Sequence, residues 1–105
     1  MRKLTFKDEF GVKHNLRFVE HLYLNNNLAI EAVDLDDGET YCMVSVNIEE
    51  LYDPSLFCYD INNNGTALYY ALIDAGLMKN TGDIKTSGYC VYPVCKWNGD
   101  VKDEH

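Results

Sequence analysis

Residues 87–97 read Ser87-Gly88-Tyr89-Cys90-Val91-Tyr92-Pro93-Val94-Cys95-Lys96-Trp97, and they include two of the chain's four cysteines and its single tryptophan. The alternation of apolar and smaller residues predicts a final β-strand rather than a surface loop. Because Pro93 cannot donate a backbone hydrogen bond, we expect it at an edge, an end or a bulge of the sheet. A strand this apolar must pack on the elements before it, and it therefore decides the fold.

Alternating segments separated by turn residues precede this strand. The strongest hairpin signal is Asp36-Asp37-Gly38-Glu39, because its Asp-Gly pair stands between two alternating runs. Apolar residues at a three-and-four spacing predict a single helix that starts near Asn64 or Thr66 and ends at Gly76. Strands are expected over residues 2–6, 15–24, 28–35, 40–48, 57–59 and 87–97, with a polar connection over residues 79–88.

These elements predict one α+β domain over residues 1–105, an antiparallel meander of about five to six strands with one helix packed on one face. A chain of 105 residues removes roughly 60–70% of its unfolded surface from water, so it needs no staple to fold. The sequence has no run of eighteen apolar residues, and we therefore expect no membrane segment and a cytoplasmic location.

Net charge is −8, and its distribution along the chain is uneven. Between Arg17 and Lys79 there are eleven acidic residues and no lysine or arginine. Such an interval can present an acidic field to a basic partner, although solubility alone also accounts for it. The candidate partner-binding acids are Glu31, Asp34, Asp36, Asp37 and Glu39. Direct binding of nucleic acid is not expected, because it requires clustered lysine or arginine.

No catalytic motif is present in the sequence. His14, His21 and His105 are the only histidines, and none belongs to a nucleophile or metalloprotease motif. The glycines form no phosphate-binding pattern. We therefore expect a protein that is not an enzyme and has no small-molecule substrate.

The four cysteines allow two main interpretations. Cys90 and Cys95 are spaced so that a bend at Pro93 could present both thiolates to zinc, with Cys42 and Cys58 as the other ligands. Four thiolates would make one structural zinc site with no open position. The alternative is four small buried hydrophobic residues, since free cysteine is among the most buried residue types. A disulfide or redox role is the third interpretation, and the cytoplasm disfavours it.

Tyrosine is frequent, with eight residues, and Tyr69 and Tyr70 are adjacent on the predicted helix. Neighbouring helical positions cannot both face the core. An exposed tyrosine close to acidic residues is typical of a protein-binding surface, while packing at the edge of the core is the alternative.

Several short motifs along nearly the whole chain together resemble a known family. They are Leu4-Thr5-Phe6, Asn27-Leu28-Ala29-Ile30, Gly38-Glu39-Thr40-Tyr41, Val44-Ser45-Val46-Asn47, Asp60-Ile61-Asn62-Asn63-Asn64, Gly76-Leu77, Thr81-Gly82, Ser87-Gly88-Tyr89-Cys90 and Tyr92-Pro93. The combination resembles a family of small uncharacterised proteins carried on plasmids, phages and integrative elements of Gram-positive and gut bacteria. The resemblance implies an α+β fold and a cytoplasmic setting.

Small acidic proteins of such elements include anti-CRISPR inhibitors of the RNA-guided nuclease of type II systems. The resemblance therefore implies a non-enzymatic anti-defence protein whose partner is a nucleic-acid-binding defence nuclease. The acidic middle of the chain would block the loading of nucleic acid into the basic channel of that nuclease. The alternative function is a zinc-stabilised accessory protein of plasmid maintenance or transfer with a different protein partner.

Overall fold

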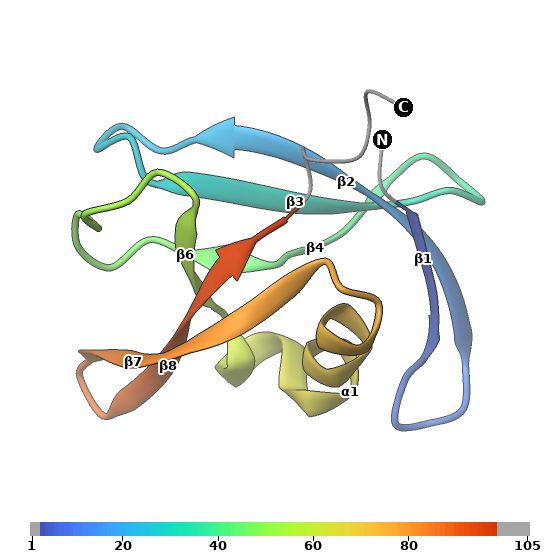
Figure 1. Ribbon diagram of the computed structural model, residues 1–105. Coiled ribbons are helices and arrows are strands. Elements are labelled where there is room, and N and C mark those ends of the chain that lie inside the picture. Colours follow the sequence, from blue (N-terminus) through green and yellow to red (C-terminus); the bar gives the residue numbers. More distant parts are fainter. Residues whose placement is uncertain (1–2, 99–105) are drawn as a thin grey trace.

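Two four-stranded antiparallel sheets and a single helix make up the part of the chain that this computed structural model describes, residues 3–98 (Figure 1). The predicted α+β class is confirmed. The first sheet has the order β1-β2-β3-β4 and the second has the order β5-β6-β8-β7. The elements are β1 (Lys3–Lys7), β2 (Lys13–Leu22), β3 (Leu28–Asp34), β4 (Thr40–Met43), β5 (Ser45–Val46), β6 (Leu56–Tyr59), α1 (Ile61–Asp74), β7 (Met78–Ser87) and β8 (Cys90–Trp97).

The first sheet is the predicted meander, formed by three successive hairpins. The predicted Asp-Gly turn joins β3 to β4, and Gly38 adopts the left-handed conformation there, with φ of 75°. One side of this sheet faces the main core, because Leu16 and Phe18 alternate along β2 with residues that face outward. That side packs on the helix and on the second sheet.

The predicted strand over residues 40–48 is divided at Val44 into two short strands that belong to different sheets. Val44 is fully buried, and its amide donates to the carbonyl of Ile30 in β3 at 2.8 Å. Its own carbonyl accepts a hydrogen bond from the amide of Asp60 at 2.9 Å. Val44 therefore joins the two sheets, and the chain passes here from one to the other.

The helix begins earlier than predicted. Asp60 is its N-cap residue, and its carboxylate accepts from the amide of Asn63 at 3.3 Å. Gly65 interrupts the helix with φ of 72°, so the expected start near Asn64 or Thr66 coincides with this kink. The predicted end is confirmed, since Gly76 has φ of 75° and the amide of Leu77 bonds to the carbonyl of Leu72 at 3.0 Å.

The polar connection predicted over residues 79–88 is instead part of a strand, β7. Only Met78 is buried in this strand, so its side chains carry no apolar alternation that the sequence could reveal. Backbone pairing with β8 holds it in place. As a result the structure has eight strands among residues 3–98, where five to six were expected.

The final strand β8 lies between β6 and β7, and its two ends differ in burial. Trp97 packs edge-on against Phe18 of the first sheet and Phe57 of the second, with ring centroids 5.5 and 6.0 Å apart. Pro93 pairs with Ile84 of β7 just beyond the last residue of β8 that β6 contacts, Val94. This is the end-of-ladder position that the sequence predicted for a proline. Within residues 3–98, no helix is both long enough and apolar enough to cross a membrane.

Candidate functional site

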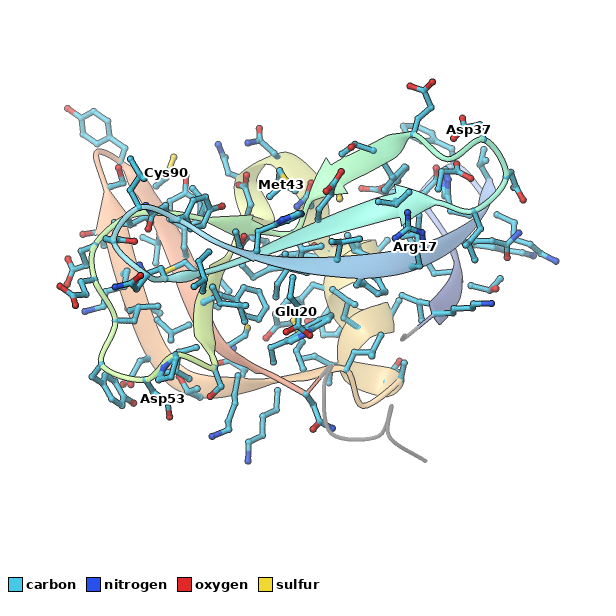
Figure 2. The ribbon with its side chains drawn as sticks, turned by 90° about the horizontal axis from the view of Figure 1, so that it is seen from above. Arg17, Glu20, Asp37, Met43, Asp53 and Cys90 are labelled. Atoms are coloured by element: carbon cyan, nitrogen blue, oxygen red, sulfur yellow. The ribbon has the colours of Figure 1, made fainter. Side chains whose placement is uncertain are left out.

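Four of the five predicted partner-binding acids gather at the turn between β3 and β4, and we call Asp34, Asp36, Asp37 and Glu39 the acidic tip. Figure 2 shows Asp37 at the far end of the first sheet. The Asp34 carboxylate accepts from the amide of Asp36 at 2.8 Å, and the Asp37 carboxylate accepts from the amide of Glu39 at 2.9 Å. These short-range bonds shape the turn so that it holds four carboxylates within six residues.

The acidic tip is exposed and its charge is not neutralised locally. Asp36, Asp37 and Glu39 are exposed and Asp34 is half-buried. Among residues 3–98, no lysine, arginine or histidine forms an ion pair with any of these four carboxylates. Like charges this close add to one another's potential, so the tip is a concentrated source of negative field.

Glu31 stands apart from the acidic tip. It lies in the middle of the outward side of the first sheet, directly opposite Val19 and Met43. Its carboxylate accepts hydrogen bonds from the Thr40 hydroxyl and from Nε2 of His21, the latter at 3.0 Å. The Thr40 and His21 bonds lower the pKa of Glu31. This carboxylate is therefore already engaged within the protein and is less available to a partner than the tip.

The two tyrosines divide as the helical geometry requires. Tyr69 is half-buried against the core, close to the ring of Tyr59 at 5.3 Å, and its hydroxyl accepts from Nδ2 of Asn80 at 2.7 Å. Tyr70 is 60% exposed. Both lie on α1 with their rings 5.1 Å apart, and no hydrogen bond or ring contact within residues 3–98 joins them to the acidic tip. Tyr70 alone of the pair offers a free ring surface.

The four cysteines are all free thiols, and they fall into two groups. Cys42 and Cys95 pack in the main core, while Cys58 and Cys90 pack in a smaller apolar cluster on the other side of the second sheet. Alternation along the strands requires this division, because Cys95 pairs with Phe57 and Val94 pairs with Cys58, so that Cys95 and Cys58 face opposite ways.

Within residues 3–98 no group of three or more cysteine, histidine or acidic side chains is close enough to hold a metal ion. Burial raises the pKa of Cys42 and of Cys95 to about 12 and also raises that of Cys58, so these three thiols are protonated at neutral pH. The bound form of a cysteine–zinc site requires thiolates. This geometry favours the interpretation of the cysteines as buried hydrophobic residues, and the structural zinc stays a prediction.

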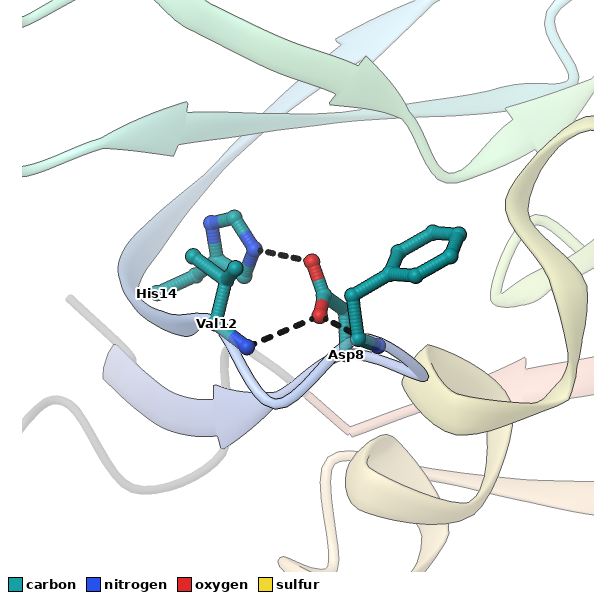
Figure 3. Close-up of polar contacts among 4 residues, drawn as sticks. Asp8, Val12 and His14 are labelled. Carbon is teal, nitrogen blue, oxygen red and sulfur yellow. Dashed lines mark hydrogen bonds and ion pairs between the residues drawn. The ribbon is translucent and has the colours of Figure 1, made fainter.

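A hollow of about 520 Å³ opens between the β1–β2 turn and the start of the helix. Asp8, Tyr41 and Cys42 are among its lining residues. The Asp8 carboxylate is 2.9 Å from Nε2 of His14 and also accepts from the amides of Phe10 and Val12 (Figure 3). The hydrogen bond to His14 is the main cause that lowers the pKa of Asp8.

A carboxylate that holds an imidazole is half of a nucleophilic catalytic arrangement, so this pair needs a chemical test. Cys42 lines the same hollow, but burial and, secondarily, the charge of Asp60 raise the pKa of its thiol to about 12. The thiol is therefore protonated at neutral pH. A protonated thiol is not the attacking form. The two amide bonds to Asp8 instead close the β1–β2 turn, which gives the pair a structural task.

Two contacts were not predicted from the sequence, the Asp8–His14 pair and the hydrogen bond between Glu20 and Trp97. The first had a local signal in the hairpin register, because His14 lies directly opposite Phe6 and Asp8 follows Phe6 by two positions, which makes Asp8 and His14 diagonal neighbours. The bond between Glu20 and Trp97 links β2 to β8 across 77 positions and leaves no local signal. The sequence shows only that Glu20 interrupts an alternating apolar series, Leu16, Phe18, Leu22 and Leu24.

A search of protein-family models, of curated proteins and of solved structures finds no match to this chain.

Proposed function

We propose that this protein is a non-enzymatic inhibitor that binds a host defence nuclease and blocks the loading of nucleic acid. The acidic tip would occupy part of the basic channel in which the nuclease holds its nucleic acid. The class of partner follows from the family resemblance of the sequence, and the mode of binding follows from the charge of the tip. The type II RNA-guided nuclease is the first partner to test.

The single observation that carries the binding mode is the unneutralised charge of the acidic tip. Four carboxylates lie on one turn, and no described cation pairs with them. Lys85 of β7 and Lys96 of β8 pair with Glu49 and Asp53 of the loop between β5 and β6, at 2.8 and 3.8 Å. Some acids elsewhere are thus paired with a cation, whereas the tip places four unpaired carboxylates on one turn, which is the pattern expected of a surface that meets a basic partner.

A turn of this kind resembles a short stretch of phosphate backbone in its charge. The rigid hairpin presents the carboxylates without the ordering cost of a flexible segment, because the Asp34 and Asp37 side chains already hold the turn. Complementary charge mainly accelerates association, by ten-fold to a thousand-fold in steered complexes. The tip would therefore set the rate at which the inhibitor finds its partner.

The test measures the association rate constant with the purified nuclease as a function of salt. Reversing Asp36, Asp37 and Glu39 to lysine should slow association at least about ten-fold at low ionic strength and should flatten the salt dependence. Target cleavage should recover in parallel. The variant loses the turn hydrogen bond from the amide of Glu39 to Asp37, but none of the three side chains is buried, so the melting temperature should fall only slightly.

A matched control changes the net charge equally at other places. Glu50, Asp74 and Asp83 are exposed and form no ion pair among residues 3–98. Reversal of these three acids should slow association much less than reversal of the tip. Equal effects of the two triple variants would reduce the mechanism to net charge, and an association rate that responds to neither salt nor the tip variant would refute it.

A further inference from the structure

The outward side of the β1–β2 hairpin carries a group of cations, and we call Lys3, Lys7, Lys13 and Arg17 the basic face. Lys3 lies directly opposite Arg17, and Lys7 lies directly opposite Lys13. Their neighbours in sequence, Phe6, Leu16 and Phe18 among them, point into the core, so the four cations point away from it. The two rows of cations are about 13 Å apart along the strands.

This arrangement costs stability within the isolated protein. Like charges directly opposite one another on neighbouring strands destabilise a sheet, and here two such pairs occur in one hairpin. Within residues 3–98 none of the four cations forms an ion pair with an acidic residue. Arg17 is close enough to Glu31 to contribute to lowering its pKa, but only as the last of the causes.

Protection of a sheet edge explains part of the basic face. Lysine on an edge strand prevents unwanted pairing with other chains, and β1 is the edge of the first sheet. Lys13 and Arg17, however, are on β2, which has a neighbour on both sides. Edge protection therefore does not account for Lys13 and Arg17, whereas a partner that supplies negative charge does.

The basic face and the acidic tip lie next to each other. Leu16 of β2 is directly opposite Asp34, the first residue of the tip, and Arg17 is opposite Val33. The amide of Leu35 donates to the carbonyl of Asn15 at 2.8 Å. Figure 2 shows Arg17 and Asp37 at the same end of the first sheet. A partner that binds one patch therefore comes close to the other.

We propose that the basic face binds the acidic tip of a second copy of this chain, in a reciprocal dimer. Each patch has four charges, and the two have opposite signs. When adjacent patches are related by a two-fold axis, each tip reaches the other copy's basic face, so that both contacts form at once and the assembly closes at two copies. A nucleic acid would match the basic face alone and would meet the repulsion of the adjoining tip.

This dimer would cover the acidic tip, so a second copy and the nuclease would compete for it. The proposal concerns the isolated protein, and its test does not involve the nuclease. Failure of the dimer would leave the proposed inhibitory function untouched, and failure of inhibition would leave the dimer untouched.

The test is sedimentation velocity of the full chain across a concentration series at about 0.1 M and about 1 M salt, where the Debye length falls from about 10 to about 3 Å. We expect a monomer–dimer equilibrium at the lower salt that weakens at least about ten-fold at the higher salt. Reversal of the basic face (K3E, K7E and K13E together) and reversal of the tip (D36K, D37K and E39K together) should each give monomers.

Two further samples separate lost charge complementarity from damage to the fold. An equimolar mixture of the two triple variants should dimerise, since each copy then meets a patch of opposite sign. The six-fold variant with both patches reversed should also dimerise with itself. Failure of both to regain the dimer, growth into longer polymers, or a wild-type protein that stays monomeric at about 1 mM and 0.1 M salt would overturn the proposal. If the protein stays monomeric and binds a single-stranded oligonucleotide through the basic face, the proposal is wrong and the ligand of this face is a polyanion.

Discussion

The hydrogen bond from Nε1 of Trp97 to the Glu20 carboxylate, 2.8 Å long, joins the last strand to the first sheet. A hydrogen bond to a charged group contributes about 1.5–3 kcal/mol, and one between neutral groups about half of that. Glu20 is exposed, while Trp97 is only 5% exposed. Water can therefore reach the carboxylate more easily than the indole, and we expect the change Glu20→Ala to cost about 1–1.5 kcal/mol.

The assay is urea denaturation, followed by tryptophan fluorescence and by circular dichroism. Trp97 is the single tryptophan, so its emission reports directly on this contact. With a denaturant slope of about 1–1.5 kcal/mol per molar, the midpoint should fall by about 1 M. Glu20→Gln keeps an acceptor and should lose less than half as much. Glu50→Ala, a change at an exposed acid, should leave the midpoint unchanged within error.

A double-mutant cycle isolates the bond itself. Trp97→Phe removes the indole N–H, and circular dichroism can still follow unfolding in its absence. In that background Glu20→Ala should cost close to nothing. If Glu20→Ala lowers the stability of the Trp97→Phe variant as much as it lowers that of the unmodified protein, the effect does not come from this hydrogen bond and the reasoning is refuted.

Two other predictions concern the cysteines and the response to acid. Cys95 is fully buried in the main core and Cys90 is half-buried, so Cys95→Ala should cost about 1–2 kcal/mol in denaturant unfolding and Cys90→Ala less than half of that. Equal costs, together with about one zinc per chain by elemental analysis, would establish the four-thiolate site instead. The folded-state pKa values of Asp8 and Glu31 are lowered, mainly by the hydrogen bonds from His14 and from Thr40, so both groups stabilise the fold above their unfolded pKa values. This contribution should disappear as the pH falls through their folded pKa values, and the stability difference between the unmodified protein and Asp8→Asn should vanish at low pH; a difference that is constant with pH would contradict it.

The features that the sequence predicted correctly depend on local physics. The Asp37-Gly38 turn follows from the left-handed conformation that glycine accepts, and the helix end at Gly76 follows from the same property. In the strand expected over residues 15–24, Leu16 and Phe18 are two positions apart and both are buried, as alternation along a strand requires. The sequence also indicated the charge of the acidic tip, because its four acids lie within six consecutive residues.

Other features depend on contacts between distant residues, and only the tertiary structure decided them. β7 exists because β8 provides a hydrogen-bonding partner, and its own exposed side chains give no sign of a strand. Val44 divides one predicted strand in two because its amide and carbonyl have partners in different parts of the fold. The separation of Cys58 from Cys95 onto opposite sides of the second sheet depends on the register of β6 with β8, and spacing along the chain contains no information about that register.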